Sequence, residues 1–235
     1  MTNENTNTAP VPISDLLPTN GSRLAAARRA LDAGLIHVEP DFDRMTPDEV
    51  AAANRERALD WHERHTPPLF AAARASHPGV IEWARRYITG TLGPRHSLLL
   101  LGRVGAGKTH QAYGALHAIA DSGHPPAIWY GTTAANLYAR MRPGGSDDPE
   151  GELARLADAD LLLLDDLGAS KDSEFVEDTT LRLIDERYIN LRPTIITTNL
   201  SRRDLRGKLG DRTASRFSAI CTAIELADDD HRRAR

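Results

Sequence analysis

The chain has 235 residues, of which 40% are hydrophobic and one is cysteine, as in a globular protein of one or two domains without a disulfide scaffold. No apolar run approaches the roughly 20 residues that cross a bilayer, and the polar start lacks an export signal. The net charge of -4 excludes a uniformly basic surface, so any contact with nucleic acid has to come from a local patch. We therefore expect a cytoplasmic protein that does not enter a membrane.

The first part of the chain is predicted to be a tail followed by helices. Residues 1–20 are rich in Asn, Thr and Pro, and burial of their few apolar groups cannot offset the entropy lost on ordering, so they are predicted to be flexible. Thr46, followed by Pro47 and Glu49, has the pattern of a capping box at a helix start. The helices predicted in this part cover residues 22–31, 47–64 and 78–89.

From residue 97 the chain alternates short apolar runs with helical stretches, which is typical of an α/β fold. Most of the runs are too continuously apolar for half-exposed strands, so they are predicted to form a parallel sheet covered by helices on both faces. The five predicted strands are Ser97–Leu101, Ala127–Tyr130, Leu161–Leu164, Thr194–Thr198 and Ala219–Leu226. The predicted domains are a flexible tail at 1–20, a helical segment at 21–66 and an α/β domain at 67–235.

A phosphate-binding loop (P-loop) is predicted between the first strand and the helix that follows it. Residues 102–109 read Gly-Arg-Val-Gly-Ala-Gly-Lys-Thr, which fits the pattern G-x-x-x-x-G-K-[ST]. Glycines let backbone N–H groups turn toward phosphates, while Lys108 would reach the β- and γ-phosphates and the Thr109 hydroxyl would bind Mg²⁺. The predicted ATP ligands are Gly102, Arg103, Val104, Gly105, Ala106, Gly107, Lys108, Thr109 and His110.

Two carboxylates follow the apolar run at 161–164. Because parallel strands end at one edge of the sheet, Asp165 is expected to hold Mg²⁺ beside the phosphates and Asp166 to polarise the attacking water. Apolar strands often end in Asp, so this run by itself does not identify a magnesium site. Its position 57 residues after Lys108 is what supports the prediction. Asn199 follows the next strand and could orient water or contact the γ-phosphate; the alternative is an ordinary residue of a strand-to-helix turn.

Two further groups of side chains stand out. Residues 201–216 carry six basic and two acidic side chains, a local charge of +4 that is predicted to contact an anion. His62 and His65 come close to the zinc pattern H-E-x-x-H, but they lie three residues apart rather than four, so a solvated helix end is favoured over metal binding.

Taken in order, these motifs resemble the AAA+ ATPases of the DnaC and IstB type, which are bacterial and phage helicase loaders and transposition helpers. The resemblance covers roughly residues 65–235. Besides the P-loop it rests on Leu-Leu-Leu-Leu-Asp-Asp-Leu-Gly at 161–168, Pro-Thr-Ile-Ile-Thr-Thr-Asn-Leu at 193–200, Gly-Asp-Arg-x-x-Ser-Arg-Phe at 210–217 and Asp-His-Arg-Arg at 230–233. It implies a P-loop NTPase with an AAA+ core, a parallel five-stranded sheet between helices, no C-terminal lid and a small helical N-terminal segment.

The resemblance also implies roles for single residues. Asn199 would be sensor 1, which responds to the γ-phosphate, and either Arg232 or Arg233 would be the sensor 2 arginine. Arg216 would be an arginine finger that enters the ATP site of a neighbouring subunit, with Arg212 beside it. A finger that acts between subunits implies self-association into a ring or spiral oligomer.

Single-stranded DNA and a replicative helicase are the partners that the resemblance implies. The DNA would be held by Lys171, Ser173 and Phe175 through a cation, a hydroxyl and an aromatic face. The neighbouring acidic residues weaken this prediction, and a capped helix start with Phe175 packed inward explains the same residues. The helical segment at 21–66 would dock on the helicase, by analogy alone.

The leading interpretation is therefore an ATP-dependent helicase loader that binds single-stranded DNA and hydrolyses ATP between subunits. An IstB-like transposition helper with the same core is one alternative. A nucleotide-gated DNA clamp with little hydrolysis is another, because Asp166 is shorter than the Glu usual in AAA+ enzymes. A P-loop small-molecule kinase is disfavoured, because the paired carboxylates, Asn199 and the late arginines suit activation of water more than transfer to a hydroxyl.

Overall fold

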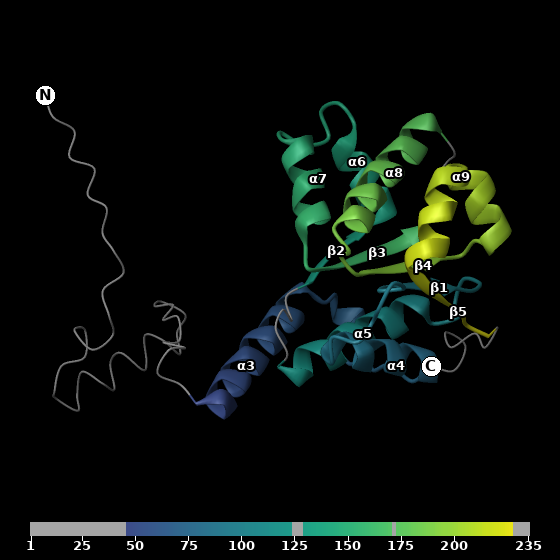
Figure 1. Cartoon of the computed structure of the whole chain (residues 1–235). Coiled ribbons are helices and arrows are strands. Elements are labelled where there is room, and N and C mark those ends of the chain that lie inside the picture. The colour runs from purple at the N-terminus through teal and green to yellow at the C-terminus, as the bar shows by residue number, and fades with distance from the viewer. Residues whose placement is uncertain (1–45, 124–128, 171–172, 228–235) are drawn as a thin grey trace, which may run out of the picture. The chain divides into compact units, whose positions relative to one another are not determined.

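The computed structural model describes residues 46–123, 129–170 and 173–227, which form a parallel sheet with helices on both faces (Figure 1). The predicted tail and the helix predicted at 22–31 lie outside the described residues, as do Lys171, Arg232 and Arg233. No helix in the described part of the chain combines the length and the apolar character needed to cross a bilayer.

The elements follow the α/β order that the sequence predicts. The helices are α3 (Pro47–His65), the short 3-10 helix η2 (Pro68–Phe70), α4 (Pro78–Ile88), α5 (Lys108–Ser122), α6 (Ala134–Met141), α7 (Pro149–Asp158), α8 (Glu174–Ile189) and α9 (Arg202–Ile220). The strands are β1 (Ser97–Leu101), β2 (Trp129–Thr133), β3 (Leu161–Leu167), β4 (Thr194–Thr198) and β5 (Cys221–Glu225). The bounds of β1 and β4 and the fold class are confirmed.

Three strands differ from their predicted bounds. Within the described residues, β2 begins at Trp129 and extends to Thr133, three residues beyond the predicted end. β3 continues through its two aspartates to Leu167, and β5 begins at Cys221 because α9 runs on to Ile220. The extension of β3 places the carboxylates inside the strand rather than after it.

The sheet has the order β2-β3-β4-β1-β5, and all neighbouring strands are parallel. β4 therefore lies between β1 and β3, although it comes after both in the chain. The carboxyl ends of these three strands meet at one edge, where the loops that follow them lie side by side. This edge gathers the segments in which the sequence predicts a functional site.

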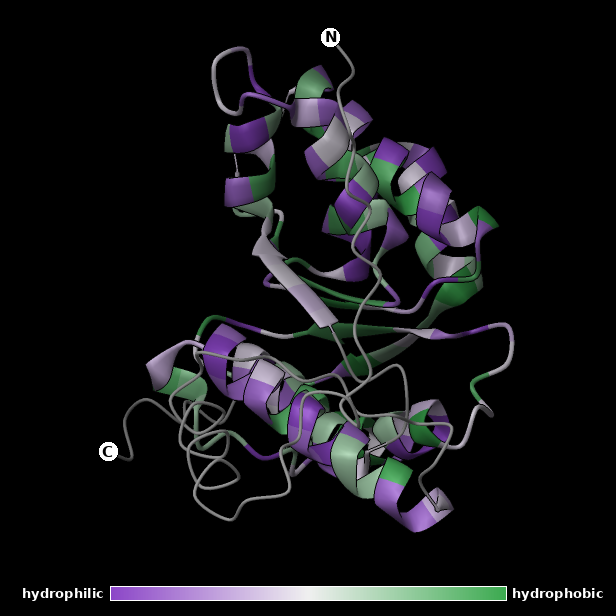
Figure 2. Ribbon diagram, turned by 90° about the vertical axis from the view of Figure 1, so that its left-hand side faces the viewer, coloured by the Kyte–Doolittle hydropathy of each residue, from purple (hydrophilic) through white to green (hydrophobic). Residues whose placement is uncertain are grey.

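Every residue of β1 and β4 is buried. Since successive side chains point to opposite sides of the sheet, both faces of these strands are covered. On β1, Leu98 and Leu100 join one hydrophobic cluster, and Leu99 and Leu101 join the other. Helices α3, α4 and α5 cover the first face, and α6 to α9 cover the second (Figure 1). Hydrophobic colour dominates most of the strands, whereas the helices alternate hydrophobic and hydrophilic colour along their length (Figure 2).

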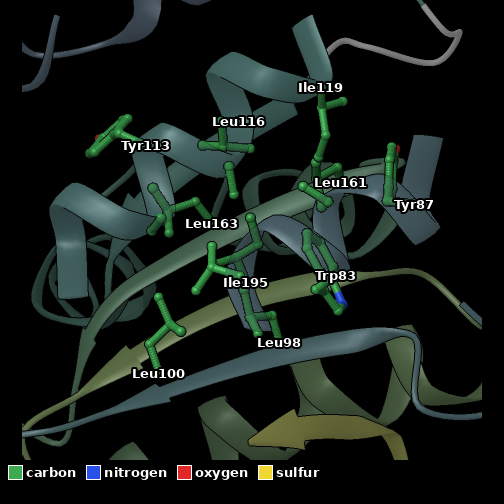
Figure 3. Packing of buried hydrophobic residues seen from close by; sticks show 14 of the residues in the cluster. Trp83, Tyr87, Leu98, Leu100, Tyr113, Leu116, Ile119, Leu161, Leu163 and Ile195 are labelled. Atoms are coloured by element: carbon green, nitrogen blue, oxygen red, sulfur yellow. The ribbon is translucent and has the colours of Figure 1, made fainter. Parts of the chain in front are cut away.

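The cluster on the first face joins α4 and α5 to the sheet (Figure 3). Leu116 and Ile119 of α5 are fully buried there, in the same cluster as Trp83 of α4. Gly114 lets α5 approach the loop before α4 closely, because a Cβ on this residue would lie 2.1 Å from the backbone N of Ala75. The segment before α4 is thus packed directly on α5.

The second face contains a fully buried cation, Arg187 of α8. Its guanidinium donates to the Leu156, Ala157, Ala159 and Pro193 carbonyls and to the Thr194 hydroxyl. Burial lowers the pKa of Arg187 to about 9, so the group is still charged at neutral pH. These bonds tie the end of α7 and the start of β4 to α8, at the edge of the sheet opposite the P-loop.

Helix α3 packs on α5. The predicted capping box is present, with the Thr46 hydroxyl accepting from the Glu49 N–H and the Glu49 carboxylate accepting from the Thr46 N–H. The indole N–H of Trp61 donates to the Trp129 carbonyl at 2.8 Å. His62 is only 4% exposed, so the prediction of a solvated helix end at this residue is wrong.

The environment of His62 makes the packing of α3 sensitive to acid. Burial, the neighbouring His117 ring at 5.4 Å and the charge of Arg74 lower the pKa of His62 to about 4. The unfolded chain takes up a proton on this ring near pH 6.5. Between pH 6.5 and pH 4 the unfolded state therefore binds more protons at this position than the folded state, and the stabilisation is lost as the pH falls.

We expect the free energy of unfolding to decrease from pH 7 to pH 4, and to decrease less in His62→Gln, whose amide does not titrate. Urea denaturation at a series of pH values measures this difference. His65→Gln is the matched control, because His65 is exposed on the same helix. Identical pH dependence in the wild type and in His62→Gln would contradict this account of His62.

Candidate functional site

The predicted P-loop joins β1 to α5 in the geometry of an anion-binding turn. Gly105 and Gly107 have φ values of 92° and 82°, a left-handed region that strongly favours glycine. α5 then begins at Lys108 with Gly107 as its N-cap. Among the α-helices of the described residues, α5 alone has no side chain that caps its start. Its first turn also contains no acidic residue. Its first N–H groups are available to a phosphate.

Lys108 is buried in the loop, with 7% of its surface exposed. Its ammonium donates to the carbonyls of Gly102 and Arg103, both at 2.8 Å, and to Asn199 Oδ1 at 2.6 Å. The ammonium is therefore held between the first residues of the P-loop and Asn199. Val104, at the tip of the same loop, is 66% exposed.

Asn199 connects the P-loop to the paired carboxylates. Its Oδ1 accepts from Lys108, and its Nδ2 donates to Asp166 Oδ1 at 2.9 Å. This arrangement follows from the strand order, since Asn199 leaves β4 between the ends of β1 and β3. The structure brings together Lys108, Asn199 and Asp166, which the sequence treats as three separate motifs.

Asp165 contacts the start of α5. The Thr109 hydroxyl donates to Asp165 Oδ1 at 3.0 Å, so the two predicted Mg²⁺ ligands lie side by side. Hydroxyl and carboxylate oxygens are donors that Mg²⁺ prefers, and protein sites often supply only one or two of them beside water and phosphate. Within the described ranges no group of three or more His, Cys, Asp or Glu side chains could hold a metal ion. The adjacent Thr109 hydroxyl and Asp165 carboxylate are oxygen donors that fit Mg²⁺.

Sequence reasoning missed Thr197 of β4. Its hydroxyl donates to Asp165 Oδ1 at 2.6 Å and accepts from the Asp166 backbone N–H at 2.9 Å. Thr197 is 1% exposed. The signal available in the sequence is the pair Thr197-Thr198, two polar residues at the end of a strand that is buried along its whole length.

Arg216 lies away from this network. It projects from α9 toward α8, where its Nε donates to Asp185 Oδ1 at 2.6 Å and its guanidinium lies 4.7 Å from the centre of the Tyr188 ring. The hydrogen bond to Asp185 raises the pKa of Arg216 above its ordinary value. Arg212 precedes it by one helical turn and is exposed. No contact within the described residues links either arginine to the P-loop of its own chain.

The predicted DNA-binding segment contains a capped helix start. The Ser173 hydroxyl accepts from the Val176 N–H and so caps α8. Phe175 is half-buried, packs against the hydrophobic cluster on the second face and has the Arg142 guanidinium 5.8 Å from its ring centre. Both residues thus have structural roles, as the alternative interpretation of this segment expects.

Known proteins have sequences similar to the part of the chain that forms this site. The family model of IstB-like ATP-binding proteins matches residues 92–224, a range that contains the P-loop, both carboxylates and Asn199. A putative ATP-binding protein in an insertion sequence of Mycobacterium tuberculosis is 33% identical over 202 residues, which are 80% of this chain and 74% of that protein. The replicative helicase loader DnaC of Escherichia coli K12 is 28% identical over 168 residues, which are 70% of this chain and 67% of DnaC.

Solved structures share the fold. The crystal structure of the DnaC helicase loader superposes with a TM-score of 0.59 at 23% identity and covers 68% of this chain and 100% of that one. The replication initiator DnaA bound to AMPPCP and single-stranded DNA superposes with a TM-score of 0.54 at 20% identity and covers 65% of this chain and 46% of that one. The chain therefore belongs to the family of IstB-like ATP-binding proteins, within the DnaC- and IstB-type AAA+ P-loop ATPases.

Proposed function

We propose that this protein is an ATP-dependent helicase loader that hydrolyses ATP and grips single-stranded DNA. The observation that carries the hydrolysis is the continuous contact from Lys108 through Asn199 to Asp166, because it joins a phosphate-binding cation to a carboxylate suited to polarise water. The similarity to the E. coli loader DnaC supports the role in replication.

In this proposal the P-loop residues bind ATP, with the backbone N–H groups around Gly105 and Gly107 and the Lys108 ammonium on the phosphates. Thr109 and Asp165 would hold Mg²⁺, which when bound neutralises charge on the β- and γ-phosphates. Asp166 accepts a proton from the attacking water, and Asn199 orients that carboxylate by the hydrogen bond described above.

Removal of the P-loop cation tests nucleotide binding. We expect Lys108→Ala to lose measurable heat of binding with ATP analogue and Mg²⁺ in isothermal calorimetry, because Lys108 supplies the charge at the phosphates. Lys208→Ala is the matched control, because it removes a lysine of α9 that lies outside the loop. Absence of binding in the wild-type protein would overturn the proposed function.

Arg216, with Arg212 beside it, is proposed to complete the ATP site of a neighbouring subunit. The Arg216 side chain is 37% exposed, and its guanidinium would have to leave Asp185 to do so. Support for this role comes from the position of Arg216 in the family pattern, together with the lack of any contact to the P-loop of its own chain within the described residues. Self-association into a ring or spiral follows from the proposal.

We expect the ATPase rate per chain to rise with protein concentration and to fall about 10³- to 10⁵-fold in Arg216→Ala. Arg206→Ala is the control, since Arg206 is an exposed arginine of the same helix that also contacts a carboxylate, Asp211. Equal rates in the wild type, Arg216→Ala and Asp166→Asn would remove these assignments and favour a nucleotide-gated clamp with little hydrolysis.

Single-stranded DNA is proposed to lie along the segment that contains Lys171, Ser173 and Phe175. The capping role of Ser173 is compatible with a phosphate contact, because its hydroxyl oxygen accepts from Val176 while its proton can still be donated. Because the Phe175 ring is only partly exposed, the Lys171 ammonium and the Ser173 hydroxyl are proposed to provide most of the DNA binding. Arg232 or Arg233 stays the proposed sensor 2.

A transposition helper is the second candidate, and the insertion-sequence relative at 33% identity favours it. The two candidates differ in partner. We expect the protein to copurify with the replicative helicase of the cell in which it occurs, through residues 21–66. Complex formation with a transposase, without helicase binding, would favour the transposition helper instead.

A further inference from the structure

The two aspartates of β3 sit in a β-bulge. Leu164 pairs with Ile196 of β4, and Leu167 pairs with Thr198, so Asp165 and Asp166 together face the single residue Thr197. Asp166 adopts a φ of 56°, in the left-handed region, which an Asp tolerates better than most residues. β3 ends one residue later, at Leu167.

The bulge changes which side chains face the core. Leu162 and Leu164 belong to the cluster on the second face, and strict alternation would place Asp166 next in that row, inside the core. Leu167 occupies that position instead and is 1% exposed, while Asp166 is exposed beside Asn199. The extra residue therefore permits two adjacent carboxylates to lie at the sheet edge without burial of either one among leucines.

Thr197 fills the space opposite the bulge and contacts both of its residues. Its hydroxyl proton goes to Asp165 Oδ1, and its oxygen accepts the N–H of Asp166 that the bulge removes from the strand ladder. Thr109 donates to the same Asp165 Oδ1. Within the described residues Asp165 Oδ2 accepts no hydrogen bond, so the carboxylate is held on one oxygen and offers the other.

We propose that Thr197 is a positioning residue that separates the roles of the paired carboxylates. Through one hydroxyl it orients Asp165 toward the cation site and holds the Asp166 backbone in the conformation that turns its side chain toward Asn199. The consequence for the cation and for hydrolysis rests on the proposed function, whereas the effect on the Asp166 backbone does not.

Neighbouring residues provide matched variants. Thr197→Val removes the hydroxyl and keeps the side-chain shape, and Thr197→Ser restores the hydroxyl. Thr198→Val is the control for lost hydrogen bonds, because Thr198 is also fully buried and its hydroxyl also makes two bonds, to the Leu167 carbonyl and from the Leu200 N–H. Both valine variants should therefore lose similar thermal stability.

The first measurement is hydrogen exchange at the Asp166 amide in the nucleotide-free protein. We expect faster exchange in Thr197→Val, and wild-type exchange in Thr197→Ser and Thr198→Val. Unchanged exchange in Thr197→Val would overturn the proposal, and this result does not depend on whether the protein binds ATP.

The second measurement is the affinity for Mn²⁺, followed by electron paramagnetic resonance, in the presence of a non-hydrolysable ATP analogue. We expect Thr197→Val to bind Mn²⁺ about 10- to 100-fold more weakly, the usual effect of losing a partner of a metal ligand, with recovery in Thr197→Ser. Equal losses in Thr197→Val and Thr198→Val would reduce Thr197 to a structural role and would overturn the proposal. Failure of the wild type to bind the analogue would instead contradict the proposed function, and the exchange measurement would still decide the role of Thr197.

Discussion

The position of β4 between β1 and β3 is the constraint on which the site depends. Each of these strands delivers polar side chains near its carboxyl end: a lysine after β1, an asparagine after β4 and two aspartates within β3. A side chain at the end of the central strand is the one that can reach both neighbours, and Asn199 does so with its two amide atoms. Exchange of β4 with an outer strand would separate the cation from the carboxylates.

Much of this site could be predicted from the sequence, because its signals are local. The P-loop needs only glycines at left-handed positions before a helix, and β1 and β4 are short apolar runs with clear ends. The role of Thr197 could not be predicted, since the bulge depends on the register between strands more than 30 residues apart. The burial of His62 was missed for a similar reason: the ring is covered by α5, which its own helix does not reveal.

The helices on the second face of the sheet carry residues proposed to contact DNA and a neighbouring subunit. Helices α8 and α9 lie on the second face and are joined by the contact between Arg216 and Asp185. The interior of this face is secured at the opposite edge of the sheet by the buried guanidinium of Arg187. Arg187 lies on α8 between Asp185 and Tyr188, the two residues that Arg216 contacts, so the buried cation also fixes the part of α8 on which Arg216 rests.

Helix α5 begins at the P-loop and ends beside α3. Its fifteen residues span about 22 Å. Lys108 and Thr109 form one end, and at the other end Gly123 lies so near α3 that a Cβ would approach the Ala51 carbonyl oxygen to 2.7 Å. The loop that ends in Lys108 and the close contact with α3 therefore belong to one continuous helix, and the position of the phosphate-binding end relative to α3 is fixed by the length of α5.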